Sequence, residues 1–199
     1  MSSEQSDTRH KILKSASNLL ENGTPSDVRM ADVAKAAGIS RQALYLHFPN
    51  RADLLIATVR YLDQLNNVDK GLAASRAAAS GVERLELFIE AWGSYIPKIY
   101  GNARALMAMK DTDAAAAATW EDRQQAIRHG CEAAIKALKA DGALSPEHSA
   151  KQATDILWML VSIQNWEHLT KQCGWSQKRY VDTTTQMAKT LLVDTLKQA

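Results

Sequence analysis

The sequence predicts an all-α protein with a three-helix N-terminal head and a larger helical body. Its 199 residues are rich in alanine, leucine, lysine, glutamine and glutamate, which are strong helix formers. They lack the alternating valine, isoleucine and threonine runs that indicate strands. Turn-forming residues divide the chain into segments of helical length. We expect the head at residues 1–52 and the body at residues 53–199.

The first expected helix covers residues 7–22. Ile12, Ala16 and Leu20 recur there at helical spacing and form an apolar face. The Asn22-Gly23 pair ends the helix, because both residues tolerate the left-handed conformation found after a helix end. A short loop then leads to two further helices of the head.

These two helices, at residues 30–37 and 41–48, are expected to form a helix-turn-helix. Gly38 can adopt the left-handed conformation that ends a helix without a side-chain penalty. Ser40 can cap the helix that follows, and Pro49 ends it, since proline disfavours a helical residue before it. In this arrangement the second helix enters the major groove of DNA.

The helix at 41–48 has one apolar and one polar face. Leu44 and Phe48 lie four residues apart and form its buried stripe. Its other face carries Arg41, Gln42, Tyr45 and His47. The planar guanidinium of arginine matches the two acceptors of guanine, and glutamine can pair with adenine through two hydrogen bonds. We therefore expect Arg41 and Gln42 to read base edges.

Residues 37–51 read Ala-Gly-Ile-Ser-x-x-x-Leu-Tyr-x-His-Phe-x-Asn-Arg, and this run resembles the DNA-binding signature of the TetR family of transcriptional regulators. The resemblance covers about residues 8–56. It implies that Tyr45 and His47 contact the DNA backbone, and that Arg51 does so where the family normally has lysine. The expected DNA-binding residues are Ser40, Arg41, Gln42, Tyr45, His47 and Arg51.

The first half of the body is expected to hold three helices. A long helix over residues 51–74 continues from the motif, carries a leucine-rich face and connects head and body. Gly81 precedes a helix at 82–99. The Gly101-Asn102 pair separates that helix from a short one that ends near Met109.

Three longer helices are expected in the second half. Asp111-Thr112-Asp113 offers caps for a helix over residues 114–140. A Ser-Pro-Glu sequence opens the next helix, at 145–172, with proline at a position that helix starts favour. Ser176 caps the last helix, which we expect to reach Lys197.

Composition disfavours several other classes of protein. No apolar run approaches the roughly 20 residues of a membrane span, so we expect a cytoplasmic protein. Cys131 and Cys173 are too few for a disulfide framework, and lone helical cysteines are usually inert, which disfavours a redox sensor. The five histidines show no metal-ligand spacing and no glycine-rich phosphate loop is present. We expect no catalytic residue, metal or cofactor.

The charge distribution supports a nucleic-acid partner weakly. The net charge is +2, and residues 1–60 hold eight Lys and Arg against six Asp and Glu, so the whole excess lies in the head. Placement is the stronger argument, because Arg41, His47 and Arg51 cluster around one helix. Double-stranded operator DNA is therefore the expected partner.

The resemblance implies a homodimer formed through the last two helices. One head makes too few contacts for a specific site, whereas a dimer on a palindromic operator places two recognition helices about 34–36 Å apart. The expected interface consists of Ile156, Leu157, Leu160, Val161 and Gln164 on one helix and Val181, Thr184, Thr185, Ala188, Leu191, Leu192 and Thr195 on the other. The alternative is that these residues pack only within one chain.

An aromatic cluster in the body is the candidate site for a small-molecule effector. Its members are Trp92, Tyr95, Tyr100, Trp120, Trp158 and Trp166. Such residues suit a mostly apolar or aromatic ligand, although they could simply fill the core. The resemblance implies a repressor whose effector shifts the helix at 51–74 and moves the heads out of register with the operator. The alternative is an architectural DNA-binding protein with no effector.

Overall fold

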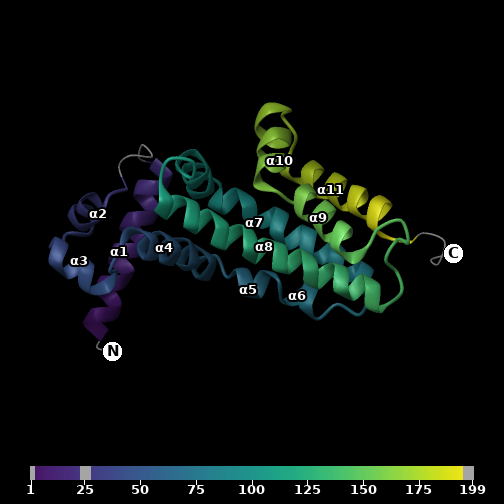
Figure 1. Ribbon diagram of the computed structural model, residues 1–199, viewed down its shortest axis with the longest axis horizontal. Helices are drawn as coiled ribbons and strands as arrows, with labels where there is room; N and C mark the ends of the chain where they lie inside the picture. The colour runs from purple at the N-terminus through teal and green to yellow at the C-terminus, as the bar shows by residue number, and fades with distance from the viewer. Residues whose placement is uncertain (1–2, 23–27, 195–199) are drawn as a thin grey trace. The chain divides into compact units, whose positions relative to one another are not determined.

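The computed structural model describes residues 3–22 and 28–194 (Figure 1). Within these two ranges the regular structure is helical, apart from one isolated bridge between Leu144 and Val193. The predicted all-α class is therefore confirmed. No helix in the described ranges is both long and apolar enough to span a bilayer.

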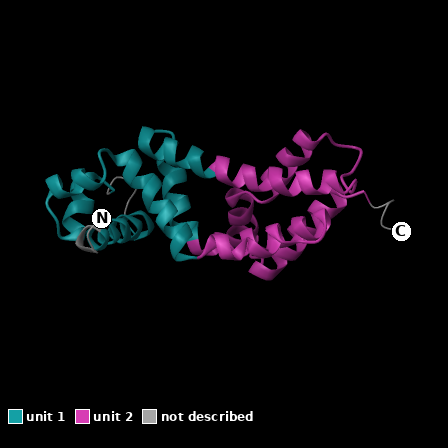
Figure 2. Ribbon diagram, turned by 90° about the horizontal axis from the view of Figure 1, so that it is seen from below, with its two compact units in different colours: residues 1–66, 99–123 teal, residues 67–98, 124–199 magenta. Residues whose placement is uncertain are grey.

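The contacts divide the chain into two compact units, which Figure 2 colours separately. Unit 1 comprises Met1–Asn66 and Ile99–Arg123, and unit 2 comprises Asn67–Lys98 and Gln124–Ala199. Two long helices, α7 (Gly81–Met109) and α8 (Ala114–Ala140), each contribute residues to both units. The expected head at residues 1–52 lies within unit 1, and its independence as a domain stays a prediction.

Unit 1 is built around its N-terminal helices. These are α1 (Ser3–Asn22), α2 (Met30–Ala37), α3 (Arg41–His47) and α4 (Arg51–Leu65). Helix α1 packs against both α2 and α4, and the end of α7 and the start of α8 complete the unit. Its core is apolar and includes the fully buried Ile12, Leu20, Leu44, Leu54, Leu55 and Leu106.

Two predicted boundaries in unit 1 are wrong. The helix expected at 51–74 ends at Leu65, because Asn67 adopts a left-handed conformation (φ 52°) that asparagine tolerates. Two short helices, α5 (Val68–Gly71) and α6 (Ala73–Arg76), follow. Conversely, the break expected at Gly101-Asn102 is absent, and α7 runs through it. Asn102 is buried there and accepts a hydrogen bond from the hydroxyl of Ser17 (3.4 Å).

Unit 2 contains the C-terminal helices. These are α9 (Ala150–Leu160), α10 (Ile163–Glu167), the π-helical turn η2 (His168–Gln172) and α11 (Gln177–Leu192). The prediction of a single helix over residues 145–172 is wrong, both in where the helix starts and in its being continuous. It begins after Ser149, which forms a capping box with Gln152, and it is interrupted where Ser162 caps α10. The cap predicted at Ser176 is confirmed by a hydrogen bond from the Arg179 N–H.

A proline inside α7 creates a polar connection within unit 2. Pro97 has no N–H to donate to the carbonyl of Gly93, four residues earlier. The side-chain amide of Gln177 supplies the missing donor (Nε2 to Gly93 O, 2.7 Å). The side-chain oxygen Oε1 of Gln177 accepts a hydrogen bond from the indole N–H of the buried Trp166 (2.8 Å). Gln177 thereby joins α7, α10 and α11.

We expect Gln177→Glu to destabilise unit 2 by about 1–3 kcal/mol. The carboxylate can still accept from the Trp166 indole, but its second oxygen faces the Gly93 carbonyl, where a donor is required. Urea unfolding followed by hydrogen exchange of unit 2 peptides measures the loss. Gln164→Glu, at an exposed position of α10, is the matched control and should change stability little. Equal stability of the two variants would contradict the role given to Gln177.

Candidate DNA-binding site

The turn between α2 and α3 has the predicted geometry. Gly38 is left-handed (φ 68°), and its N–H donates to the carbonyl of Lys35 (3.2 Å). The N–H of Ile39 donates to Ala34 O (3.0 Å), so the last carbonyls of α2 are satisfied. Ser40 caps α3 by accepting from the N–H of Ala43 (3.1 Å), as predicted. These local bonds fix the direction in which α3 leaves the turn.

The buried stripe beneath α3 is also confirmed. Leu44 is fully buried and Phe48 nearly so, and both belong to the core of unit 1. The guanidinium of Arg9, from α1, lies over the Phe48 ring (5.1 Å to the ring centroid). Anchoring on this side leaves the opposite side of α3 free to meet a partner.

That opposite face presents most of the predicted DNA-binding residues. Arg41 and Gln42 are exposed, Tyr45 is 51% exposed, and His47 is half-buried at the end of α3. Leu46, which the sequence reasoning passed over, is 83% exposed on the same helix. The face therefore combines hydrogen-bond donors and acceptors with one apolar side chain, and both kinds of group can contact base edges in the major groove. The individual DNA contacts stay predictions.

Arg51 is held by other parts of unit 1. Its guanidinium donates to the carbonyl of Val28 (2.5 Å) and to the carboxylate of Asp113. Asp113 in turn accepts from the N–H of Ala116 (2.9 Å) and so caps α8. Burial raises the pKa of Asp113. The hydrogen bonds from Ala116 and Arg51 lower it by more, so the pKa lies below its ordinary value of 3.8. Arg51 thus joins the starts of α4 and α8, and its phosphate contact stays a prediction.

Comparing Arg51→Ala with Asp113→Ala separates these two roles. Each variant loses the ion pair, and we expect each to lower stability by about 1–3 kcal/mol. Because the folded pKa of Asp113 is depressed, this contribution is present at neutral pH and is lost as the pH falls below about 4. If Arg51 also binds phosphate, only Arg51→Ala reduces the slope of log K against log salt, by about 1. Equal slopes would leave Arg51 with a structural role alone.

A second ionic cluster fixes the far end of α4 within unit 1. Arg60 pairs with Asp122 (2.9 Å), and Arg123 pairs with both Asp63 (2.6 Å) and Asp122 (2.5 Å). Burial raises the pKa of Asp122, while its hydrogen bonds and charge contacts with the two arginines lower it to below its ordinary value. Helix α4 is therefore bonded to α8 near both ends, and it belongs to the same unit as the recognition helix.

The aromatic residues predicted to bind an effector are divided between the units. Tyr100 and Trp120 belong to unit 1, where Trp120 packs against the core. The other four belong to unit 2. There the rings of Trp92 and Tyr95 meet edge to face (centroids 5.7 Å apart), and Trp158 lies under the guanidinium of Arg128. The fourth is Trp166, already described as buried. Their role in ligand binding stays a prediction.

Unit 2 also holds a buried polar group that the sequence reasoning missed. The hydroxyl of Tyr180, on α11, is the one buried side-chain polar atom in the described ranges that has no hydrogen-bond partner. Burial raises the pKa of Tyr180 to about 12, against a smaller lowering by the nearby side chain of Thr184, so the hydroxyl stays protonated. The sequence gives little indication that Tyr180 is buried, because it directly follows the charged residues Lys178 and Arg179. A buried hydroxyl without a partner is costly and calls for an explanation.

The two cavities described in unit 2 are lined by other residues. One groove of about 650 Å³ lies between α7 and α11, beside the ion pair of Glu86 and Lys189 (2.5 Å). The other, of about 360 Å³, lies between α8 and α9 and includes Lys136 and Lys151. In the described ranges, no group of three or more His, Cys, Asp or Glu side chains is placed to hold a metal ion.

Known proteins share the motif and the fold. Residues 12–58 match the family described as bacterial regulatory proteins, tetR family. The transcriptional regulator EthR of Mycobacterium tuberculosis is 29% identical over 157 residues, which cover 73% of this chain and 69% of that protein. The nucleoid occlusion factor SlmA of Marinomonas sp. is 31% identical over 64 residues, which cover only 32% of this chain and 32% of that protein.

Solved structures of transcriptional regulators align along nearly the whole chain. One from Saccharomonospora viridis, in complex with choline, has a TM-score of 0.74 at 19% identity and covers 95% of this chain and 99% of its own. NalD, the secondary repressor of an efflux pump in Pseudomonas aeruginosa, has a TM-score of 0.70 at 20% identity, with coverages of 96% and 99%. These likenesses establish the shared fold. Residues 12–58 therefore carry a helix-turn-helix domain that matches the tetR family, and the chain as a whole is similar in fold to transcriptional regulators.

Proposed function

We propose that this protein is a ligand-responsive repressor that binds a palindromic operator as a homodimer and is released by a small, mostly apolar or aromatic effector. The exposed face of α3 is the observation that carries the proposal. Its polar side chains project from a helix anchored by Leu44, capped by Ser40 and oriented by Gly38. The repressor NalD shares the fold, which favours repression over activation.

Selection of DNA from a random duplex library tests this proposal. The purified protein should enrich one palindromic sequence with half-site centres about 10 base pairs apart and bind it as a dimer. Arg41→Ala should lower affinity by about 1–3 kcal/mol and relax specificity at one base position. Enrichment of no sequence, with equal affinity for random duplexes, would instead support the architectural alternative.

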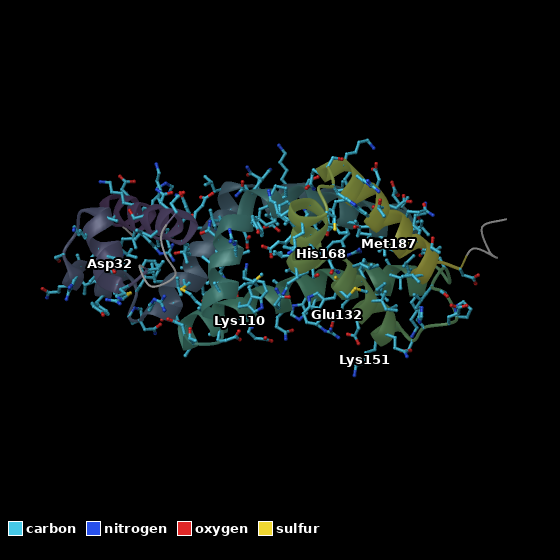
Figure 3. All side chains as sticks on the ribbon, turned by 90° about the horizontal axis from the view of Figure 1, so that it is seen from above. Asp32, Lys110, Glu132, Lys151, His168 and Met187 are labelled. Carbon is cyan, nitrogen blue, oxygen red and sulfur yellow. The ribbon has the colours of Figure 1, made fainter. Side chains whose placement is uncertain are left out.

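The predicted dimer surface requires a revised composition. Much of the expected band is buried within the single chain, where α9 and α11 pack together: Leu157, Leu160, Val161, Ala188 and Leu192. Thr195 lies outside the described residues. Leu191, a member of the expected band, is 40% exposed, and two apolar neighbours outside that band, Met159 and Met187, are 53% and 45% exposed; Figure 3 shows Met187 on α11. We propose that these exposed side chains form the subunit contact.

We expect Met187→Asp to weaken dimerisation by about 2–4 kcal/mol, or roughly 30- to 1,000-fold. The substitution places an unpaired carboxylate where the proposed interface excludes water. Sedimentation velocity over a concentration series measures the change. Leu65→Asp, at an exposed leucine of α4, is the control and should leave dimerisation intact. Dimers of unchanged affinity would place the subunit contact elsewhere.

Unit 2 offers an aromatic environment and one polar handle for the effector. Trp92, Tyr95 and Trp166 supply apolar ring surface, and the unpartnered Tyr180 hydroxyl can hydrogen-bond a polar group of the ligand. The complex of a related fold with choline supports a small-molecule effector as a class. Binding would shift the population of conformations, with a coupling of about 1–3 kcal/mol between effector and DNA.

The connector helix expected at residues 51–74 is shorter in the structure, since α4 ends at Leu65. Helix α4 is bonded to α8 through Arg51–Asp113 and Arg60–Asp122, and it belongs to the same unit as the recognition helix. The chain passes between the units after Asn66 and within α7 and α8. We propose that effector binding in unit 2 acts on the head through these three connections.

A further inference from the structure

Leu46 is the most exposed of the large apolar side chains in the described ranges. It is 83% exposed, against 59% for Leu65, the next most exposed. Scattered apolar residues on a surface are ordinary, but Leu46 lies on the short helix α3, whose other side is anchored in the core by Leu44. Its position on that helix therefore decides whether its exposure has a function.

The helical geometry places Leu46 at the centre of the outward face. A helix advances about 100° per residue, so Leu46 lies about 160° from the buried Leu44. Gln42, one turn earlier, is only about 40° from Leu46, and both are exposed. Arg41 lies further round, at the edge of this face. The two side chains that point most directly away from the core are thus one amide and one branched alkyl group.

We propose that Leu46 reads the C5 methyl group of a thymine in the major groove, beside the base pair that Gln42 contacts. Thymine is the one base that presents a methyl group there, and apolar side chains recognise it by contact. An amide next to it can pair with adenine through two hydrogen bonds. The Gln42–Leu46 pair therefore specifies an A·T-containing step in each half-site. This inference rests on the proposed function and names a specificity-determining residue for it.

Removing single methyl groups from the DNA tests the inference. The probe is the duplex that the wild-type protein enriches from the random library, with deoxyuridine replacing thymidine at one symmetric pair of positions at a time. Uracil keeps the base pairing and lacks only the methyl group. One buried methyl group is worth about 0.8 kcal/mol, or about fourfold in affinity. At one position per half-site, the wild type should therefore lose about 15-fold when both half-sites are changed.

Two variants test whether Leu46 is the residue that reads the methyl group. Leu46→Ala should bind the thymine and uracil duplexes equally, while Leu65→Ala, an exposed leucine outside α3, should keep the wild-type sensitivity. A wild-type protein that is indifferent to every uracil substitution would overturn the inference. A Leu46→Ala variant that keeps the 15-fold difference would also overturn it, because another residue then reads the methyl group. If the library enriches no sequence, the proposed function itself fails, and that outcome is separate from both.

Discussion

Leu44→Ala is expected to destabilise unit 1 by about 2–5 kcal/mol and to abolish specific DNA binding. Leu44 is fully buried and, apart from the capping residue Phe48, is the buried side chain of α3. Truncation leaves a cavity beneath a helix of seven residues, which is too short to persist without tertiary packing. The recognition surface is then lost, although none of its exposed residues has been changed.

Leu46→Ala is the matched control, two positions along the same helix. Because Leu46 is 83% exposed, its truncation should leave the free energy of unfolding within about 0.5 kcal/mol of the wild type. Hydrogen exchange read by mass spectrometry compares the two variants peptide by peptide. Protection should fall in α1 to α4 for Leu44→Ala and stay unchanged in α9 and α11. Native protection of α3 in Leu44→Ala would show that Leu44 does not anchor it.

Gly81→Ala is expected to destabilise unit 2 by about 3 kcal/mol or more. A Cβ atom at this position would lie 2.5 Å from the backbone nitrogen of Leu138 and 2.6 Å from its Cα. Backbone atoms of α8 cannot rotate away as a flexible side chain could, so the start of α7 must move. That movement also breaks the hydrogen bond from the Gly81 N–H to the carboxylate of Asp141 (2.5 Å).

Gly71→Ala distinguishes this steric effect from a general intolerance of glycine substitution. No atom lies within 4 Å of a Cβ built at Gly71, and its φ is not in the left-handed region. Alanine there should leave stability unchanged or raise it by up to about 1 kcal/mol, because it reduces the entropy of the unfolded chain. Thermal unfolding of both variants measures the difference. Similar melting temperatures would contradict the close approach of α7 and α8.

The helix-turn-helix was predictable because its determinants are local. Gly38, Ser40 and Leu44 each act within about four residues, through a left-handed turn, a cap and a buried stripe. The same holds for the cap at Ser176. Where one local feature competed with tertiary packing, prediction failed. Gly101-Asn102 resembles a helix stop, but burial of Asn102 against Ser17 keeps α7 continuous.

The exposed residues of the candidate site could be predicted from the sequence, whereas the long-range contacts that hold the site in place could not. The partners of Arg51 are Val28 and Asp113, which lie 23 and 62 residues away along the chain. Sequence spacing carries no information on such pairs, so the sequence predicts only the phosphate contact of Arg51. The Tyr180 hydroxyl was missed for the same reason, since its lack of a partner depends on how the helices of unit 2 pack around it.

A genome-wide footprint of the bound protein in its host tests the central claim most directly. A ligand-responsive repressor predicts one or a few discrete sites, each a palindrome with half-site centres about one helical turn of DNA apart. The genes beside those sites then indicate which class of effector to test against Tyr180→Phe. Broad occupancy without a palindrome would contradict the claim and identify an architectural DNA-binding protein instead.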